Sequence, residues 1–175
     1  KPTILFTHRK MVEIANQVGL NSINEPLHES KAIDWYDTYF PYLEEQLNKT
    51  CPAPVNFQYK IGAQVMLVRN LPDAQAVNGT RGVIIDISPL GCITVQFENS
   101  EVIGFNKQDY MWEIKHNRKV MASRQQYPLI LYWAGTVHKS QGLTLGSGVL
   151  GIDKSFASGQ AMVALSRFRR LQDFS

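Results

Sequence analysis

The hydrophobic positions of the chain change their period along its length. A short β-branched and aromatic run, TILF at residues 3–6, opens the sequence. The apolar residues that follow keep the i, i+3, i+4, i+7 spacing of an amphipathic helix: Met11, Ile14, Ala15 and Val18. We expect Thr7 to cap this helix and Gly19 to end it. A strand followed at once by a helix is typical of α/β folds.

Short strands dominate the stretch from Tyr59 to Tyr127. Turn signals such as Asn78-Gly79 separate β-rich runs with the sequences AQVMLVRN, TRGVIIDI, CITVQFEN, EVIGFN and YMWEI. Strands this short and closely spaced predict a small antiparallel barrel. The preceding segment, residues 21–57, has weaker periodicity. There we expect one short helix within WYDTYFPYLEEQLNK and otherwise irregular, solvent-facing chain.

After Pro128 the α/β pattern returns. LILYWAGTV has the composition of a buried strand that runs into a turn, and GSGVLGI that of a further strand. The final segment, ASGQAMVALSRFRRLQ, is predicted to be a helix capped by Ser158. Its apolar face is formed by Ala161, Ala164, Leu165 and Phe168. The pattern as a whole predicts an α/β domain interrupted by an inserted β-barrel.

Composition narrows the picture only slightly. Of the 175 residues 44% are hydrophobic and 19% charged, which is typical of globular proteins. We expect no membrane span and no signal peptide, and the initial Lys1 suggests a segment of a longer protein. Cys51 and Cys92 lie far apart, so we expect reduced structural thiols rather than a metal or redox site. The net charge of +3 is compatible with nucleic-acid binding without requiring it.

The densest polar chemistry lies in TVHKSQG, residues 136–142. Hydroxyl, imidazole, ammonium and amide groups follow a buried strand, and a glycine allows close backbone approach. Such groups suit phosphate oxygens, although a short Lys-Ser turn can also be merely solvated. A Walker A loop needs GxxxxGK[ST], and neither Lys139-Ser140 nor Lys154-Ser155 has the upstream glycine. No Walker B pattern is visible either, so the sequence holds no complete triphosphate site.

Two basic clusters have competing interpretations. Arg167, Arg169 and Arg170 lie late in the last predicted helix, where they can complement the helix dipole or stay solvated. Alternatively, Arg167 projects toward the nucleotide of another domain and stabilises charge on the transferring phosphate. The run KHNRK at residues 115–119 is interpreted as a solvated turn, with a phosphate-contacting loop as the alternative.

Several of these strings together resemble the C-terminal half of the Pif-type (petite integration frequency) DNA helicases, RecD-like motors of superfamily one. The resemblance covers nearly the whole chain outside residues 21–57. It rests on these strings: ILFTHRKMVEIAN, KIGAQVMLVRNL, VNGTRGVI, GTVHKSQGLTL and FASGQAMVALSRFRRLQ. It implies a second RecA-like domain built from residues 1–60 and 128–175. It also implies a Src-homology-three-like barrel inserted at residues 61–127.

The resemblance further implies an ATP-dependent helicase that moves 5′ to 3′ along single-stranded DNA. Its functions would lie in DNA repair, recombination, replication or telomere maintenance, in the nucleus or mitochondrion of a eukaryote or the cytoplasm of a bacterial or viral host. ATP and Mg²⁺ would be held mainly by an N-terminal RecA-like domain, in cis or in trans. Without that domain this chain should be inactive.

The resemblance also assigns roles to individual residues. DNA phosphates would be contacted by Thr136, His138, Lys139 and Ser140. The nucleotide side would involve Gln141 and Gly142, with Arg167 as the catalytic arginine finger. Asn70 and Asn78 are candidates for DNA contacts from the barrel.

The sequence departs from the family pattern at three positions. The family usually has Asp at Gly146, an aromatic residue at Met162 and Asn at His8. These differences put in doubt the conformation of the chain after the TVHKSQG motif and a contact near the adenine of ATP. A non-enzymatic relic that binds single-stranded DNA is the main alternative, and a purely structural subunit is the third.

Overall fold

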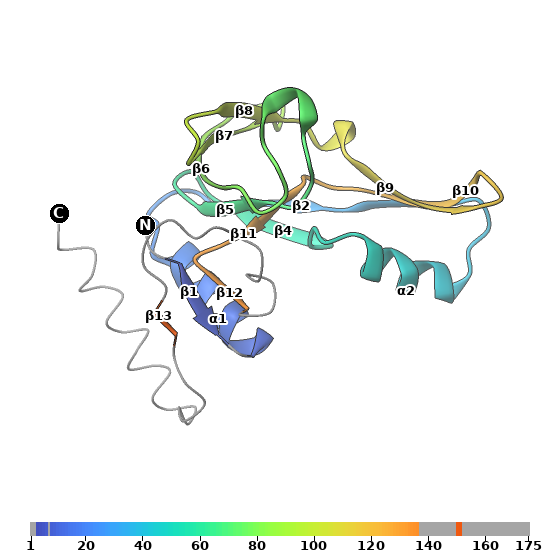
Figure 1. Ribbon diagram of the computed structural model, residues 1–175, viewed down its shortest axis with the longest axis horizontal. Coiled ribbons are helices and arrows are strands. Elements are labelled where there is room, and N and C mark those ends of the chain that lie inside the picture. The colour runs from blue at the N-terminus through green and yellow to red at the C-terminus, as the bar shows by residue number, and fades with distance from the viewer. Residues whose placement is uncertain (1–2, 7, 137–149, 152–175) are drawn as a thin grey trace. The chain divides into compact units, whose positions relative to one another are not determined.

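The computed structural model describes residues 3–6, 8–136 and 150–151 (Figure 1). Contacts divide the chain into two compact units, residues 1–24 with 132–175 and residues 25–131. The predicted insertion, residues 61–127, falls within the second unit, and so do residues 25–60, which were predicted to belong to the α/β domain. None of the helices within the described ranges is long and apolar enough to cross a membrane.

The first unit contains a parallel sheet with the strand order β12-β1-β13. The central strand β1 (Ile4–Phe6) is followed by α1 (Arg9–Asn21), and its neighbours are β12 (Ala134–Thr136) and β13 (Leu150–Gly151). Ile4 aligns with Ala134 on one side and with Leu150 on the other. Phe6, Ala15 and Ala134 form a buried cluster against which the apolar face of α1 packs. The predicted strand–helix start is confirmed. The single strand predicted within LILYWAGTV is instead two strands, β12 here and a separate strand at Leu129–Leu131 that belongs to another sheet.

Both predicted ends of α1 are wrong. The N-cap residue is His8, whose side chain makes no capping hydrogen bond, and the helix continues past Gly19 to Asn21. Gly19 stays inside the helix because the indole of Trp133 packs on it. A Cβ atom at Gly19 would lie 2.7 Å from Trp133 Cε2. The glycine therefore serves close packing rather than helix termination.

The second unit contains an antiparallel sheet with the order β11-β5-β6-β7-β8. Its strands are β5 (Gln64–Leu67), β6 (Arg81–Ile87), β7 (Ile93–Phe97), β8 (Val102–Phe105) and β11 (Leu129–Leu131). Inward-facing side chains such as Leu67, Ile84 and Phe105 are completely buried. The predicted strands are confirmed, but β11 and β8 remain the two edges of this sheet among the described strands. The expected closed barrel is therefore not observed.

A second sheet, with the order β3-β10-β9, extends from this unit as an arm (Figure 1). It comprises β3 (Ile33–Tyr36), β9 (Met111–His116) and β10 (Lys119–Gln125), and α2 (Pro41–Thr50) covers one face. The β-rich run YMWEI thus pairs in the arm rather than in the larger sheet. Asn117 and Arg118 have positive φ in the tight turn between β9 and β10, so the predicted turn at KHNRK is confirmed.

Residues 21–57 are far more ordered than the sequence suggested. Besides β3 and the predicted helix α2, they include β2 (His28–Lys31), which pairs with β4 (Asn56–Tyr59). The partner strands of β2 and β3 lie outside their local sequence, so no hairpin signal marked either strand. Ile33 in β3 aligns with Gln125 in β10. The prediction of an irregular segment is wrong, whereas the predicted exposure to solvent is confirmed for most of its residues.

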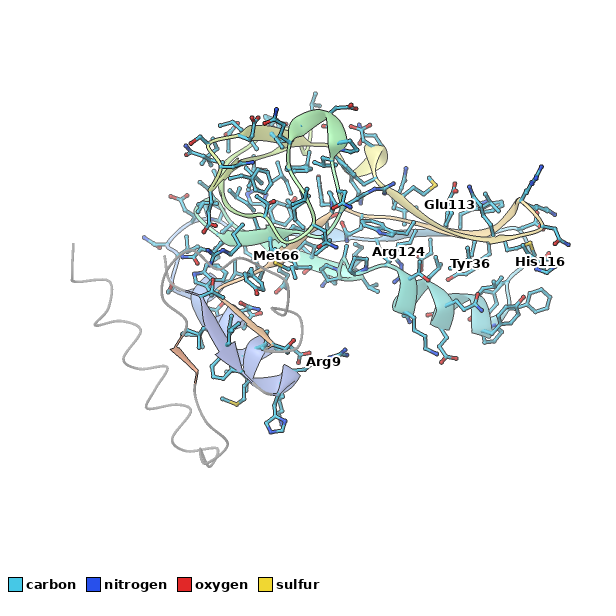
Figure 2. All side chains as sticks on the ribbon, in the orientation of Figure 1. Arg9, Tyr36, Met66, Glu113, His116 and Arg124 are labelled. Atoms are coloured by element: carbon cyan, nitrogen blue, oxygen red, sulfur yellow. The ribbon has the colours of Figure 1, made fainter. Side chains whose placement is uncertain are left out.

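A buried arginine joins the layers of the arm. The guanidinium of Arg124, whose side chain is 2% exposed, donates to both carboxylate oxygens of Asp34 at 2.7 Å. It also donates to Asn48 Oδ1 at 2.8 Å, which links β10 to α2. The label of Arg124 in Figure 2 marks this place at the base of the arm. Removing one partner of such a pair leaves the other without compensation in a partly buried place.

We predict that Gly19→Ala destabilises the first unit. Alanine normally stabilises a helix interior relative to glycine by about 0.5–1 kcal/mol. Here the added methyl group meets the Trp133 indole, and overpacking should reverse the sign and cost about 1–3 kcal/mol. Amide hydrogen exchange of α1 measures the change. Gln17→Ala, at an exposed position of the same helix, is the control. Slower exchange in Gly19→Ala would contradict the packing argument.

We also predict that Arg124→Met lowers the free energy of unfolding of the second unit. The loss should be about 2–3 kcal/mol, below the value for a fully buried pair because Asp34 keeps 24% exposure of its side chain. The matched control is Arg81→Met, whose partner Glu98 is 52% exposed and which should cost under about 1 kcal/mol. Urea unfolding provides the measurement. Equal losses in the two variants would show that burial of Arg124 adds nothing.

Candidate functional site

The carboxyl ends of β1 and β12 lie at one edge of the parallel sheet. Phe6 and Thr136, the last residues of the two strands, are aligned with each other. His8 follows at the start of α1 and is exposed, while Thr136 is half-buried. Ligands of parallel α/β sheets bind outside the carboxyl ends of their strands. The structure therefore brings Thr136, the first residue of the polar motif, and the start of α1 to the edge where such a sheet binds ligands.

Most of the predicted site residues lie outside the described part of the chain. Of the DNA and nucleotide residues predicted from the sequence, the structure describes Thr136, Asn70 and Asn78. The others fall in the undescribed ranges: His138, Lys139, Ser140, Gln141, Gly142 and Arg167. Gly146 and Met162, two of the departures from the family pattern, fall there as well. Their placement stays a prediction.

Asn16 makes a contact to β12 that the sequence did not reveal. Its Oδ1 accepts hydrogen bonds from the backbone N–H groups of Trp133 at 2.8 Å and Ala134 at 2.9 Å. Its Nδ2 donates to the carbonyl oxygen of Ala134 at 3.2 Å. The signal in the sequence is slight: one amide beside the apolar stripe of the predicted helix. The side chain nevertheless fixes the backbone where the chain enters the strand that ends at Thr136.

Asn70 and Asn78 meet in an exposed loop of the second unit. The backbone N–H of Asn78 donates to Asn70 Oδ1 at 2.8 Å. The Thr80 hydroxyl donates to the carbonyl oxygen of Val77 at 2.8 Å, which closes the turn that Gly79 completes with a φ of 98°. The predicted turn at Asn78-Gly79 is thus present within an ordered loop. Both asparagines are exposed, and Asn70 Oδ1 is engaged by the loop itself.

Arg69 supports the same loop at its base. Its guanidinium donates to the Met111 carbonyl oxygen at 2.8 Å and lies 5.5 Å from the ring centroid of Trp112. A planar guanidinium over an indole is a favourable cation–π arrangement. These contacts tie the loop to β9, so the two asparagines project from a supported rather than a free-standing segment.

Both lysines of the basic turn at residues 115–119 form ion pairs. Lys115 pairs with Glu113 at 2.8 Å, and Lys119 pairs with Asp37 at 2.7 Å. Paired lysines contribute little net attraction for phosphate. The geometry favours the solvated turn over the phosphate-contacting loop.

Burial shifts the pKa of several groups packed in the second unit. Burial first, and then the nearby Tyr59, raise the pKa of Tyr127 to about 12. The Tyr127 hydroxyl donates to the Gly91 carbonyl oxygen. Burial likewise raises the pKa of the Cys51 thiol. Groups kept neutral in this way serve packing and do not act as acids or bases near neutral pH.

Among the described residues no group of three or more His, Cys, Asp or Glu side chains could hold a metal ion. The described chemistry consists of hydroxyl, amide and backbone groups. It suits binding of phosphates or bases.

Comparison with known proteins agrees with the motifs. The family model described as "DNA helicase Pif1, 2B domain" matches residues 42–87, from α2 through β6. The human protein named "ATP-dependent DNA helicase PIF1" is 39% identical over 175 residues, covering 97% of this chain and 26% of the human protein. The chain therefore spans about a quarter of the length of that relative.

Solved structures give the same result. The crystal structure of the Pif1 helicase from Candida albicans matches with a TM-score of 0.74 and 31% identity, covering 95% of this chain and 42% of that one. A Bacteroides Pif1 helicase in complex with ADP-AlF3 and single-stranded DNA matches with a TM-score of 0.68 and 28% identity, covering 95% and 38%.

The strand edge at Thr136, the supported asparagine loop and these similarities lead to one conclusion. The chain belongs to the Pif1 family of DNA helicases.

Proposed function

We propose that this chain is the C-terminal motor half of an ATP-dependent DNA helicase. The observation that carries the proposal is the position of Thr136 at the carboxyl edge of the parallel sheet, at the start of a motif rich in phosphate-binding groups. The similarity to a Bacteroides relative that was crystallised with ADP-AlF3 and single-stranded DNA supports it. The helicase moves 5′ to 3′ along single-stranded DNA and unwinds duplexes inside the cell, in the maintenance of DNA.

In this proposal the motor domain is a second RecA-like domain of residues 1–60 and 128–175, although residues 25–60 and 128–131 belong by their contacts to the second unit. Residues 61–127 form the Src-homology-three-like insertion, and the β-rich sheet of the second unit supports this assignment. The N-terminal RecA-like domain supplies the Walker motifs and holds most of the ATP and Mg²⁺. This chain closes the nucleotide site from the other side and is inactive without that partner.

In this proposal the residues of the TVHKSQG motif bind two ligands, the DNA strand and the nucleotide. Thr136, with His138, Lys139 and Ser140 after it, contacts phosphates of the DNA strand. Gln141 and Gly142 continue the same segment to the nucleotide side. One short segment thus touches both ligands, which is the simplest way to link a step along DNA to a change at ATP.

Two further elements complete the proposed machinery. Arg167 places its guanidinium against the transferring phosphate, where a positive fork stabilises the charge of the transition state. Asn70 and Asn78 contact DNA from the loop that Arg69 supports. Amide side chains of this kind bind bases or phosphates without adding charge.

We predict that Arg167→Ala in the full-length protein lowers the rate of ATP hydrolysis by about 10³-fold or more. Binding of single-stranded DNA should change little, because the finger acts on the nucleotide. Arg170→Ala, three positions later in the same predicted helix, is the control and should retain activity. Steady-state ATPase assays at saturating DNA decide the point. Hydrolysis at the native rate in Arg167→Ala would refute the assignment.

We also predict that Lys139→Ala weakens binding of single-stranded DNA and flattens its salt dependence. Loss of one phosphate contact should reduce the slope of log K against log salt concentration by about 0.7. Lys154→Ala, which changes the other Lys-Ser pair, should leave the slope unchanged. Fluorescence anisotropy with labelled oligo-dT at several salt concentrations measures both. An unaltered slope in Lys139→Ala would mean that this side chain points elsewhere.

A further inference from the structure

Helix α1 and the start of β12 are joined at two points on one face of the helix. Asn16 holds the backbone of Trp133 and Ala134 through three hydrogen bonds. Three residues further along, Gly19 accommodates the Trp133 indole. Residues three apart lie on the same face of a helix. Helix α1 therefore contacts both the side chain of Trp133 and the backbone of Trp133 and Ala134.

The sheet holds the same residues from the other side. The backbone N–H of Ile4 donates to the carbonyl oxygen of Trp133 at 3.1 Å. Ala134 is completely buried, so its N–H and carbonyl groups have little access to water. A buried backbone group without a partner costs about 1–3 kcal/mol. The Asn16 amide supplies both an acceptor and a donor there, as a neighbouring strand would.

The position of Thr136 depends on this arrangement. Thr136 lies two residues beyond Ala134, at about 3.3 Å of rise per residue in an extended strand. Residues i and i+2 of a strand point to the same face, and a shift of one residue exchanges the faces. Fixing residues 133 and 134 therefore fixes both the height and the direction of Thr136 at the sheet edge.

We propose that Asn16 is a positioning residue for DNA binding, which holds strand β12 so that Thr136 meets the phosphates of single-stranded DNA. The inference rests on the proposed function of Thr136. Asn16 itself touches no DNA. It acts through the backbone, so its loss should misplace the strand end, and small misplacements of positioned groups have large effects on binding and rate.

The test uses the full-length protein and fluorescein-labelled oligo-dT. Asn16→Leu keeps the branching of the side chain at Cγ and loses all three hydrogen bonds. Asn16→Asp keeps an acceptor for the two N–H groups but places a carboxylate against the Ala134 carbonyl oxygen. We expect Asn16→Leu to raise the dissociation constant about tenfold and Asn16→Asp about threefold. Gln17→Leu removes an exposed amide from the same helix and should bind as the wild type does.

A double-mutant cycle separates positioning from general destabilisation. If Asn16 acts through Thr136, the double variant Asn16→Leu with Thr136→Val should lose less affinity for oligo-dT than the two single variants predict. Its fold-loss should be smaller than the product of the two single fold-losses. The salt slope should stay at the wild-type value in Asn16→Leu, because the Thr136 hydroxyl neutralises no phosphate charge. A merely structural defect would reduce the amount of active protein and leave the two single losses multiplicative in the double variant.

The outcomes distinguish this inference from the proposed function. A wild-type dissociation constant in Asn16→Leu would overturn the positioning role, whatever the ATPase result. Should Asn16→Leu fail to fold, wild-type binding by Asn16→Asp would overturn it equally. If the wild-type protein bound oligo-dT without hydrolysing ATP, the motor function would fail, while the binding data would still decide the role of Asn16.

Discussion

The parallel pairing of β1 with β12 is the constraint on which the first unit depends. It aligns Phe6 with Thr136 across more than a hundred intervening residues and sets two strand ends at one edge. Parallel strands need a crossover connection, and a large inserted unit between the two strands meets that need. Helix α1 covers the pair through Ala15 and holds it through Asn16. The sheet edge therefore combines residues that lie far apart in the sequence.

Polar contacts in well-shielded places recur in the second unit. Arg124 bonds Asp34 and Asn48, and the buried amide of Gln126 donates to the carbonyl oxygens of Ser30 and Pro54 at 2.9 and 3.0 Å. Buried polar groups are tolerated when every donor and acceptor finds a partner, and they then help to select one arrangement of strands. These contacts help to hold the register of short strands such as β2 and β3.

The sequence predicted the elements with strong local periodicity and missed those defined by distant partners. The apolar spacing from Met11 to Val18 revealed α1, and the β-rich runs revealed strands β5 to β9. The sequence placed the end of α1 at Gly19, but this glycine is needed for packing against the Trp133 indole. Strand β3 was missed since its partner β10 lies about ninety residues away. Within the candidate site, the polar motif that begins at Thr136 was recognised from its residue types. The hydrogen bonds of Asn16 could be identified only in the structure.

The most direct test of the account is ATP hydrolysis by the full-length protein that contains this chain, measured with and without single-stranded DNA. If Thr136 and the residues after it link the DNA strand to the nucleotide, addition of oligo-dT must raise the hydrolysis rate. A protein that binds oligo-dT yet hydrolyses no ATP in its presence would contradict the account. The chain would then be part of a DNA-binding relic and not of a motor.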